Sequence, residues 1–125
     1  MANEVTLNVS WRVAKSNYNS GSLRFPTTQM DQTTAGGGGP GYQSIGTTYE
    51  AIAFGDIAPG LVAAYNLDAT NYVELGIVQA ATFYPLIKLF PGGDYPTIFH
   101  LAAGVTLYAK ANTASCNISI QGWNA

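Results

Sequence analysis

Charged residues are scarce in this chain. They make up 10% of its 125 residues, against roughly 25% in an ordinary soluble domain. The few basic residues are scattered, so no cluster can displace counterions from phosphates, and we expect no nucleic acid partner. The basic residues are Arg12, Lys15, Arg24, Lys88 and Lys110. Thr, Ser, Asn, Gln, Gly and 8 Tyr must instead form a neutral exterior that suits contact with proteins or sugars.

Long hydrophobic runs are also missing, and we expect no leader sequence. The longest apolar stretch, residues 72–87, is interrupted by Glu74, Gln79 and Pro85, and it falls short of the ~20 apolar residues that a membrane-spanning helix needs. The first residues, MANEVTLNVSW, begin a strand pattern at once, without a basic or apolar leader region. We therefore expect no membrane partner, and synthesis in a cytoplasm.

Cysteine and histidine each occur once. Cys116 alternates with Ile118 and Ile120 in SCNISI, a pattern that predicts a buried, inert thiol and excludes an intrachain disulfide. His100 would need carboxylates or Cys116 to complete a metal site, and these occur in unrelated segments. The run GGGGPG lacks the Lys and Ser/Thr of a phosphate loop. We expect no enzyme, with no catalytic residue, no metal site and no cofactor.

The chain does contain a series of short strand patterns. In residues 4–13, apolar and polar side chains alternate without a fault. From Tyr42 onward, apolar runs are separated by turn sequences such as DATN, QAAT and PGGDYP. No window shows a sustained helical stripe. The pattern predicts one all-β domain over residues 1–125, an antiparallel sandwich or barrel with about eight strands and little or no helix. Of these two we expect the β-sandwich, in a jelly-roll-like form.

Two connections stand out between these runs. Residues 31–41, DQTTAGGGGPG, predict a flexible loop, because glycine loses the most backbone entropy on ordering. The segment LDATN predicts a tight turn in which Asp68 and Asn71 side chains bond to nearby backbone, with Tyr65 and Tyr72 close by.

Three segments carry a resemblance to a known group. The run QSIGTTYEAIAFGDIAPGLVAAYNLDATNYVELGI, the later FYPLIKLFPGG and the final LAAGVTLYAKANTAS together resemble a group of small tailed-phage virion structural proteins, over residues 43–115. The segment LFPGGDYPTIFH departs from the group by an inserted GDYP. The resemblance implies a β-sandwich that decorates or cements a capsid as a homotrimer. The chain would be made in the host cytoplasm and bind the major capsid protein on the virion surface.

We expect strand edges and two turns to make contacts with neighbouring subunits or with the shell, and the glycine run to reach across to a neighbour. The interface residues predicted are Tyr65, Asp68, Asn71, Tyr72, Gly92, Asp94, Tyr95, Gly36, Gly37, Gly38 and Gly39. Two alternatives stay open. One is a glycan-binding or receptor-binding β module associated with a tail fibre or head fibre, and the other is a neck or head–tail connector component.

Overall fold

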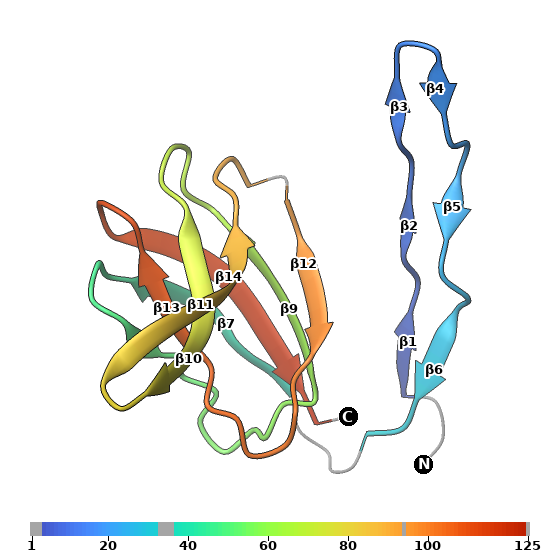
Figure 1. The fold of residues 1–125 in the computed structure, drawn as a ribbon. Helices are drawn as coiled ribbons and strands as arrows, with labels where there is room; N and C mark the ends of the chain where they lie inside the picture. The colour runs from blue at the N-terminus through green and yellow to red at the C-terminus, as the bar shows by residue number, and fades with distance from the viewer. Residues whose placement is uncertain (1–3, 33–36, 94, 125) are drawn as a thin grey trace. The chain divides into compact units, whose positions relative to one another are not determined.

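The computed structural model describes residues 4–32, 37–93 and 95–124. Every regular element in these ranges is a β-strand, which confirms the all-β prediction. Contacts divide the described residues into two compact units, one up to Gln32 and one from Gly37 to Asn124 (Figure 1). We call the first unit the arm and the second the body. The sequence pattern predicted a single sandwich over residues 1–125 and did not indicate this division.

The body is a jelly roll of eight described strands. They are β7 (Gly37–Ile45), β8 (Glu50–Ala51), β9 (Leu61–Asn66), β10 (Val73–Gln79), β11 (Thr82–Leu89), β12 (Thr97–His100), β13 (Tyr108–Ala111) and β14 (Cys116–Trp123). Two antiparallel sheets have the strand orders β12-β9-β14-β7 and β11-β10-β13-β8. Along the chain, each strand pair lies inside the one before it, so that the first strand of the body pairs with the last, the second with the second last, and so on. The pairs are β7–β14, β8–β13, β9–β12 and β10–β11. Nested pairs shared between two four-stranded sheets are the jelly-roll arrangement, as predicted.

The core lies between the two sheets. Along β14, Cys116, Ile118 and Ile120 are buried, whereas Asn117 and Gln121 are exposed. This two-residue period places every second side chain on the inner face, and it confirms the inward position predicted for Cys116. The buried apolar cluster comprises Ile45, Ile52, Val62, Ala64, Val73, Leu75, Leu89, Leu107, Ala109, Ala111, Cys116, Ile118 and Ile120.

A bulge on β11 accommodates a proline inside the sheet. Leu75 pairs with Ile87 and Gly76 with Pro85, so Leu86 is an extra residue on β11. Proline has no N–H for the ladder, and bulges are among the few sheet positions that tolerate it. A Cβ on Gly76 would collide with the carbonyl oxygen of Tyr84. Glycine is therefore required opposite the bulge, because only glycine allows this close backbone approach.

The prediction of a flexible loop over residues 31–41 is wrong for residues 37–41. These residues begin β7, in which Gly39 pairs with Gly122 and Gly37 with Trp123, while Gly38 lies at the irregularity between these pairs. Composition alone suggested a loop because ordering glycine costs backbone entropy. The partner strand β14 supplies the backbone hydrogen bonds that offset this cost. Gly36 lies outside the described residues.

The arm is a long β-hairpin built from three short ladders. The strand pairs are β1 (Val5–Leu7) with β6 (Thr28–Met30), β2 (Ser10–Trp11) with β5 (Leu23–Arg24), and β3 (Ala14–Lys15) with β4 (Tyr18–Asn19). Lys15 pairs with Tyr18 across a two-residue turn, where Ser16 has a φ of +52°. The alternating strand predicted over residues 4–13 is therefore extended, but it belongs to the arm and not to the sandwich.

Candidate interaction surfaces

The segment Asn66–Asn71 forms a hydrogen-bonded turn after β9. Asn66 is fully buried, and its side-chain amide donates to the carbonyl oxygens of Asn71 at 2.7 Å and Leu89 at 3.3 Å. Its Oδ1 accepts a hydrogen bond from the Asp68 backbone N–H at 2.9 Å. A buried amide that meets its partners in this way fixes β9 against the end of β11.

Asp68 caps the same turn. Its Oδ2 accepts hydrogen bonds from the backbone N–H groups of Thr70 at 2.9 Å and Asn71 at 2.6 Å. The N–H of Asn71, followed by that of Thr70, lowers the pKa of the Asp68 carboxyl, because both bonds favour the charged form. The Thr113 hydroxyl donates to Asn71 Oδ1 at 2.6 Å. The predicted bonding of Asp68 to nearby backbone is confirmed. The same prediction for Asn71 is wrong, because its Oδ1 accepts a hydrogen bond from the side chain of Thr113, which is far away in the sequence.

The structure brings the second predicted turn against the first. The backbone N–H of Gly92 donates to the carbonyl oxygen of Asp68 at 2.7 Å. Gly92 has a φ of +111°, a backbone conformation that glycine adopts far more readily than other residues. The two turns that the sequence analysis treated separately therefore form one end of the body. Asp94 lies outside the described residues.

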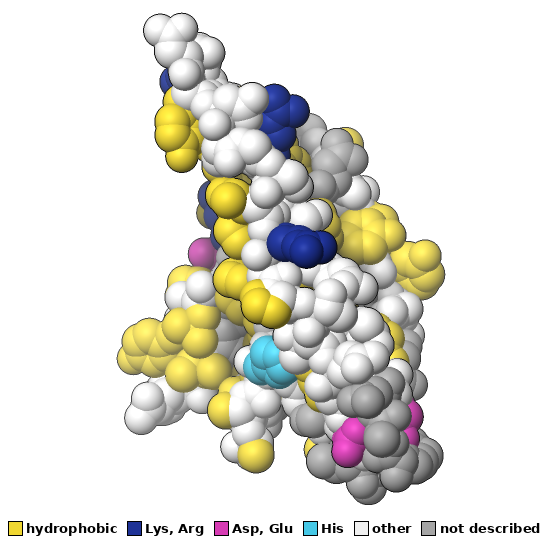
Figure 2. Space-filling view, turned by 90° about the vertical axis from the view of Figure 1, so that its right-hand side faces the viewer, with side chains coloured by type: hydrophobic (Ala, Val, Ile, Leu, Met, Phe, Trp, Pro, Cys, Tyr) yellow, Lys and Arg dark blue, Asp and Glu magenta, His cyan; other side chains and the backbone are white. Residues whose placement is uncertain are grey.

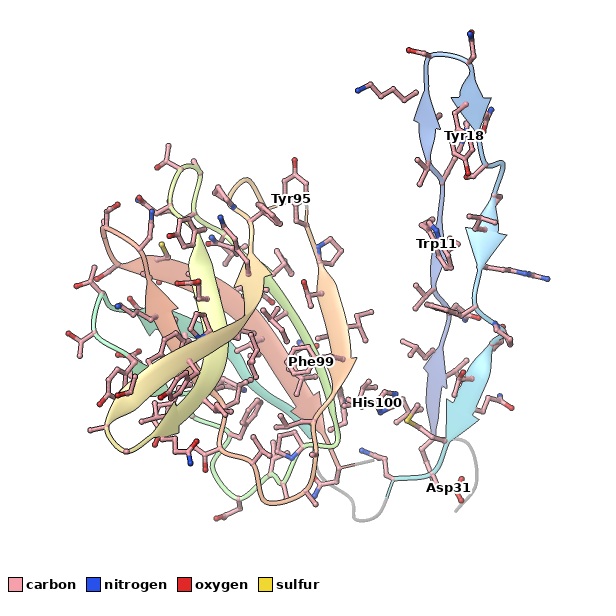
Figure 3. The ribbon with its side chains drawn as sticks, in the orientation of Figure 1. Trp11, Tyr18, Asp31, Tyr95, Phe99 and His100 are labelled. Atoms are coloured by element: carbon pink, nitrogen blue, oxygen red, sulfur yellow. The ribbon has the colours of Figure 1, made fainter. Side chains whose placement is uncertain are left out.

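Aromatic side chains and one lysine gather beside these turns. Lys88 Nζ lies 4.0 Å from the centre of the Tyr72 ring and 5.3 Å from that of Phe90, which is cation–π geometry. The rings of Phe90 and Tyr95 are 5.7 Å apart, and these side chains are 50% and 56% exposed. We call Tyr72, Lys88, Phe90 and Tyr95 the end patch; Figure 3 labels Tyr95.

The sequence analysis predicted only two members of the end patch. Tyr72 and Tyr95 were selected because they flank turn sequences. Lys88 and Phe90 were missed. Only Phe90 stands directly before the PGG turn, which could have indicated its place beside that turn. Both follow the bulge on β11, so which face of the sheet they occupy depends on a register shift that no local pattern reveals.

Tyr65 lies on another surface, the outward side of the sheet β12-β9-β14-β7. Ser119 on β14 pairs with Tyr42 of β7 on one side and Tyr65 of β9 on the other. Strands lie about 4.8 Å apart, so the two tyrosine columns are roughly 10 Å apart, with Ser119 between them. A shallow groove of about 310 Å³ follows this row and continues to Ile98. Tyr42 is 71% exposed and Ile98 is 44% exposed.

This outward surface carries almost no charge. The strands β7, β9, β12 and β14 contain no Asp, Glu, Lys or Arg. The other sheet differs, since Glu74 on β10 pairs with Lys88 and Lys110 on its two neighbours. We call the uncharged surface the neutral face. Its residues are Tyr42, Ala63, Tyr65, Ile98, Ser119 and Gln121.

The single histidine and cysteine occupy different environments. His100 is an exposed residue of β12 (Figure 3), whereas Cys116 is 1% exposed in the core. Burial, with a smaller effect from the Asp68 charge, raises the pKa of the Cys116 thiol. Its Sγ is 3.4 Å from the carbonyl oxygen of Ala114. A buried, protonated thiol is a poor nucleophile.

No family model, curated protein or solved structure matches this chain. Within the ranges that the structure describes, no helix has the length and hydrophobicity to cross a membrane.

Proposed function

We propose that the chain is a bacteriophage capsid decoration, or cement, protein that stabilises the shell through protein–protein contacts. The observation that supports this proposal best is a set of large apolar side chains exposed on a body whose core is already complete. Those of the body are Tyr42, Leu67, Tyr84, Leu86, Phe90, Tyr95, Ile98 and Val105. Two groups among them are contiguous, namely Phe90 with Tyr95 in the end patch and Tyr42 with Ile98 along the groove. Contiguous exposed apolar patches mark interaction surfaces, whereas apolar residues exposed singly do not.

The chemistry of these surfaces fits contact with protein. Figure 2 shows hydrophobic side chains exposed among uncharged polar ones, with Lys, Arg, Asp and Glu side chains at separate places between them. Interface cores are enriched in aromatic residues and depleted in charge, because a buried charge must be paired to repay its desolvation. A shell that repeats its subunits also lets modest individual contacts act together by avidity. In this proposal, the major capsid protein is the partner, on the outside of the virion.

The end patch is the surface that we assign to the shell. Its rings adjoin turns that hydrogen bonds hold together, since Asn66 and Asp68 bond to Asn71 and the N–H of Gly92 bonds to the carbonyl oxygen of Asp68. Lys88 makes a cation–π contact with the Tyr72 ring. A partner that covers both side chains therefore does not bury the Lys88 charge without an interacting group. Aromatic side chains in such settings often dominate binding energies, at about 2 kcal/mol or more each.

A binding experiment with capsids that lack the chain tests this proposal. We expect the purified chain to co-sediment with expanded capsids, and Phe90→Ser with Tyr95→Ser to weaken binding by at least about thirtyfold. The matched control is Tyr84→Ser, because Tyr84 is 48% exposed and lies toward the opposite end of β11. Wild-type protein that leaves the capsids bare would refute the proposal. Equal losses for both variants would refute the assignment to the end patch.

A glycan-binding module is the second candidate, supported by the groove on the neutral face. Tyr42 and Tyr65 flank a floor that offers the Ser119 hydroxyl and the Gln121 amide. Aromatic rings with a few polar groups between them are a common lining for small-ligand sites. Titration with neutral oligosaccharides, followed by NMR, would separate the two functions: shifts confined to the groove favour the module, and no shifts with capsid binding favour the cement protein.

A further inference from the structure

The arm has one apolar side and one polar side. On the polar side, the Thr27 hydroxyl donates to Asn8 Oδ1 at 2.7 Å and Arg12 Nε donates to Asn19 Oδ1 at 3.2 Å. The other side carries Trp11, which pairs with Leu23 in the ladder and whose ring centre is 4.9 Å from that of Phe25. Figure 3 labels Trp11 and Tyr18. We call this second side the apolar face of the arm.

The apolar face is exposed although it is built like the inner face of a sandwich. Its large side chains Trp11, Val13, Tyr18, Leu23 and Phe25 are 41%, 50%, 62%, 39% and 61% exposed. A two-stranded hairpin is at best marginally stable in water, and it needs further strands or a packed surface on its apolar side. A covering surface is therefore expected for this face.

The size of the arm indicates how many contacts are needed. About thirteen residues per strand at ~3.3 Å each give a length of roughly 40 Å, and two strands are about 10 Å wide, so one arm covers roughly 400 Å². A stable interface buries about 800 Å² on each partner. One arm supplies about half of that area. A chain that gives one arm to one neighbour and receives one from another buries that area in total, divided over two contacts.

The charges of the arm and of the body indicate where an arm would bind. Three basic and two acidic side chains give residues 1–34 a formal charge of +1, whereas two basic and five acidic ones give residues 35–125 a charge of −3. Two arms repel each other weakly, while an arm and a body attract, which favours their encounter. At the contact itself, the neutral face requires no charged side chain to be desolvated, unlike the sheet that carries Lys88, Glu74 and Lys110.

We propose that the apolar face of the arm covers the neutral face of a second copy of this chain, and that every copy gives one arm and receives one. The strands that carry Tyr42 and Tyr65 are roughly 10 Å apart, a backbone spacing at which one flat ring fits between two side chains, and Trp11 and Phe25 are the rings that the arm offers. Such head-to-tail contacts form a closed ring when the rotation between copies closes. This inference deepens the proposed function. It rests on that function only in assigning the self-association a role on the capsid shell.

Mixed-chain disulfide formation tests the contact directly. One chain carries Leu23→Cys and a second, distinguishable by a mass tag, carries Ile98→Cys; Cys116 stays in place because it is buried. After mixing and mild oxidation, we expect a covalent dimer of the two chains. The control replaces Ile98→Cys by Leu86→Cys, which lies on the other sheet and is 68% exposed; this pair should give at least tenfold less dimer.

A chain that carries both Leu23→Cys and Ile98→Cys distinguishes exchange from an internal contact. Under exchange, dilution with an excess of cysteine-free copies reduces its disulfide yield in proportion. A yield that is independent of dilution, with no mixed-chain dimer, places the arm on its own body and overturns the proposal. Equal yields with Leu86→Cys and Ile98→Cys overturn the choice of the neutral face.

Sedimentation velocity of the free protein gives an independent readout. Wild-type chains should sediment as an oligomer of the 13.2 kDa chain, and Trp11→Ser with Phe25→Ser should raise the dissociation constant at least tenfold. Tyr42→Ser with Ile98→Ser should do the same, while Tyr84→Ser with Leu86→Ser should not. A monomeric wild type overturns the inference. No capsid is present in either experiment, so arm exchange and shell binding can fail separately.

Discussion

The turn between β10 and β11 holds two alanines in a backbone conformation that suits glycine. Ala80 and Ala81 have φ values of +50° and +62°, and this left-handed region costs a residue with a Cβ roughly 1–2 kcal/mol. Ala81→Gly removes that strain at one position. Glycine adds about 0.5–1 kcal/mol of unfolded-chain entropy that folding must offset. We therefore expect a net gain of about 0.5–1 kcal/mol in the free energy of unfolding.

Denaturant unfolding measures this gain, since a more stable variant shifts the midpoint without changing the slope. The expected thermal shift is about 2–8 °C. The Tyr49 hydroxyl donates to the main-chain oxygen of Ala81 at 3.3 Å, and glycine keeps that acceptor. Ala51→Gly is the control: Ala51 lies in strand β8, so the same chemical change should destabilise by about 0.5–1 kcal/mol. A loss of stability in both variants would refute the left-handed turn.

Two further predictions concern other named groups. Folding lowers the Asp68 pKa below its ordinary value of 3.8. The stabilisation from Asp68 is therefore complete above about pH 4 and is lost as the pH falls through the lowered value. In urea unfolding between pH 5 and pH 2, the free energy of unfolding should fall less steeply for Asp68→Asn than for wild type. A Cβ on Gly122 would lie 2.7 Å from Pro59 Cβ and 2.8 Å from Phe54 Cε1. Gly122→Ala should therefore lower the free energy of unfolding, measured by calorimetry, by about 1–3 kcal/mol. Gly46→Ala is the control and should be nearly neutral, because the nearest atom to a Cβ there is 4.0 Å away.

The jelly roll was predictable because its signals are local. In SCNISI, an apolar residue at every second position fixes the buried face of β14. Short sequences such as QAAT and DATN separate the strands where the structure has turns. The capping role of Asp68 was also local, since the carboxylate bonds to N–H groups two and three residues away.

The arm and the neutral face depend on contacts that no local pattern specifies. Residues 4–13 alternate as a sandwich strand would, and only the pairing with residues 18–30 places them in a separate hairpin. Tyr42 and Tyr65 become neighbours because both pair with Ser119 of β14, far away in the sequence. Residues 37–39 likewise form a strand only because they pair with β14. Composition describes the cost of ordering these residues, but it does not describe the partner strand that offsets the cost.

Removal of residues 1–34 tests whether the body folds by itself. Every residue of the buried cluster lies between Ile45 and Ile120, so the truncation deletes no core side chain and leaves no core cavity. We expect the truncated chain to keep its near-ultraviolet circular dichroism and a free energy of unfolding within about 0.5 kcal/mol of that of the body in the full chain.

The same truncation should abolish self-association, because each body would then have no arm to receive. A truncated chain that is folded yet still oligomeric would place the self-contact on the body alone. A truncated chain that is unfolded would show that the body depends on residues 1–34 for stability, which would contradict a core confined to residues 45–120. The two measurements together separate what folds this chain from what joins its copies.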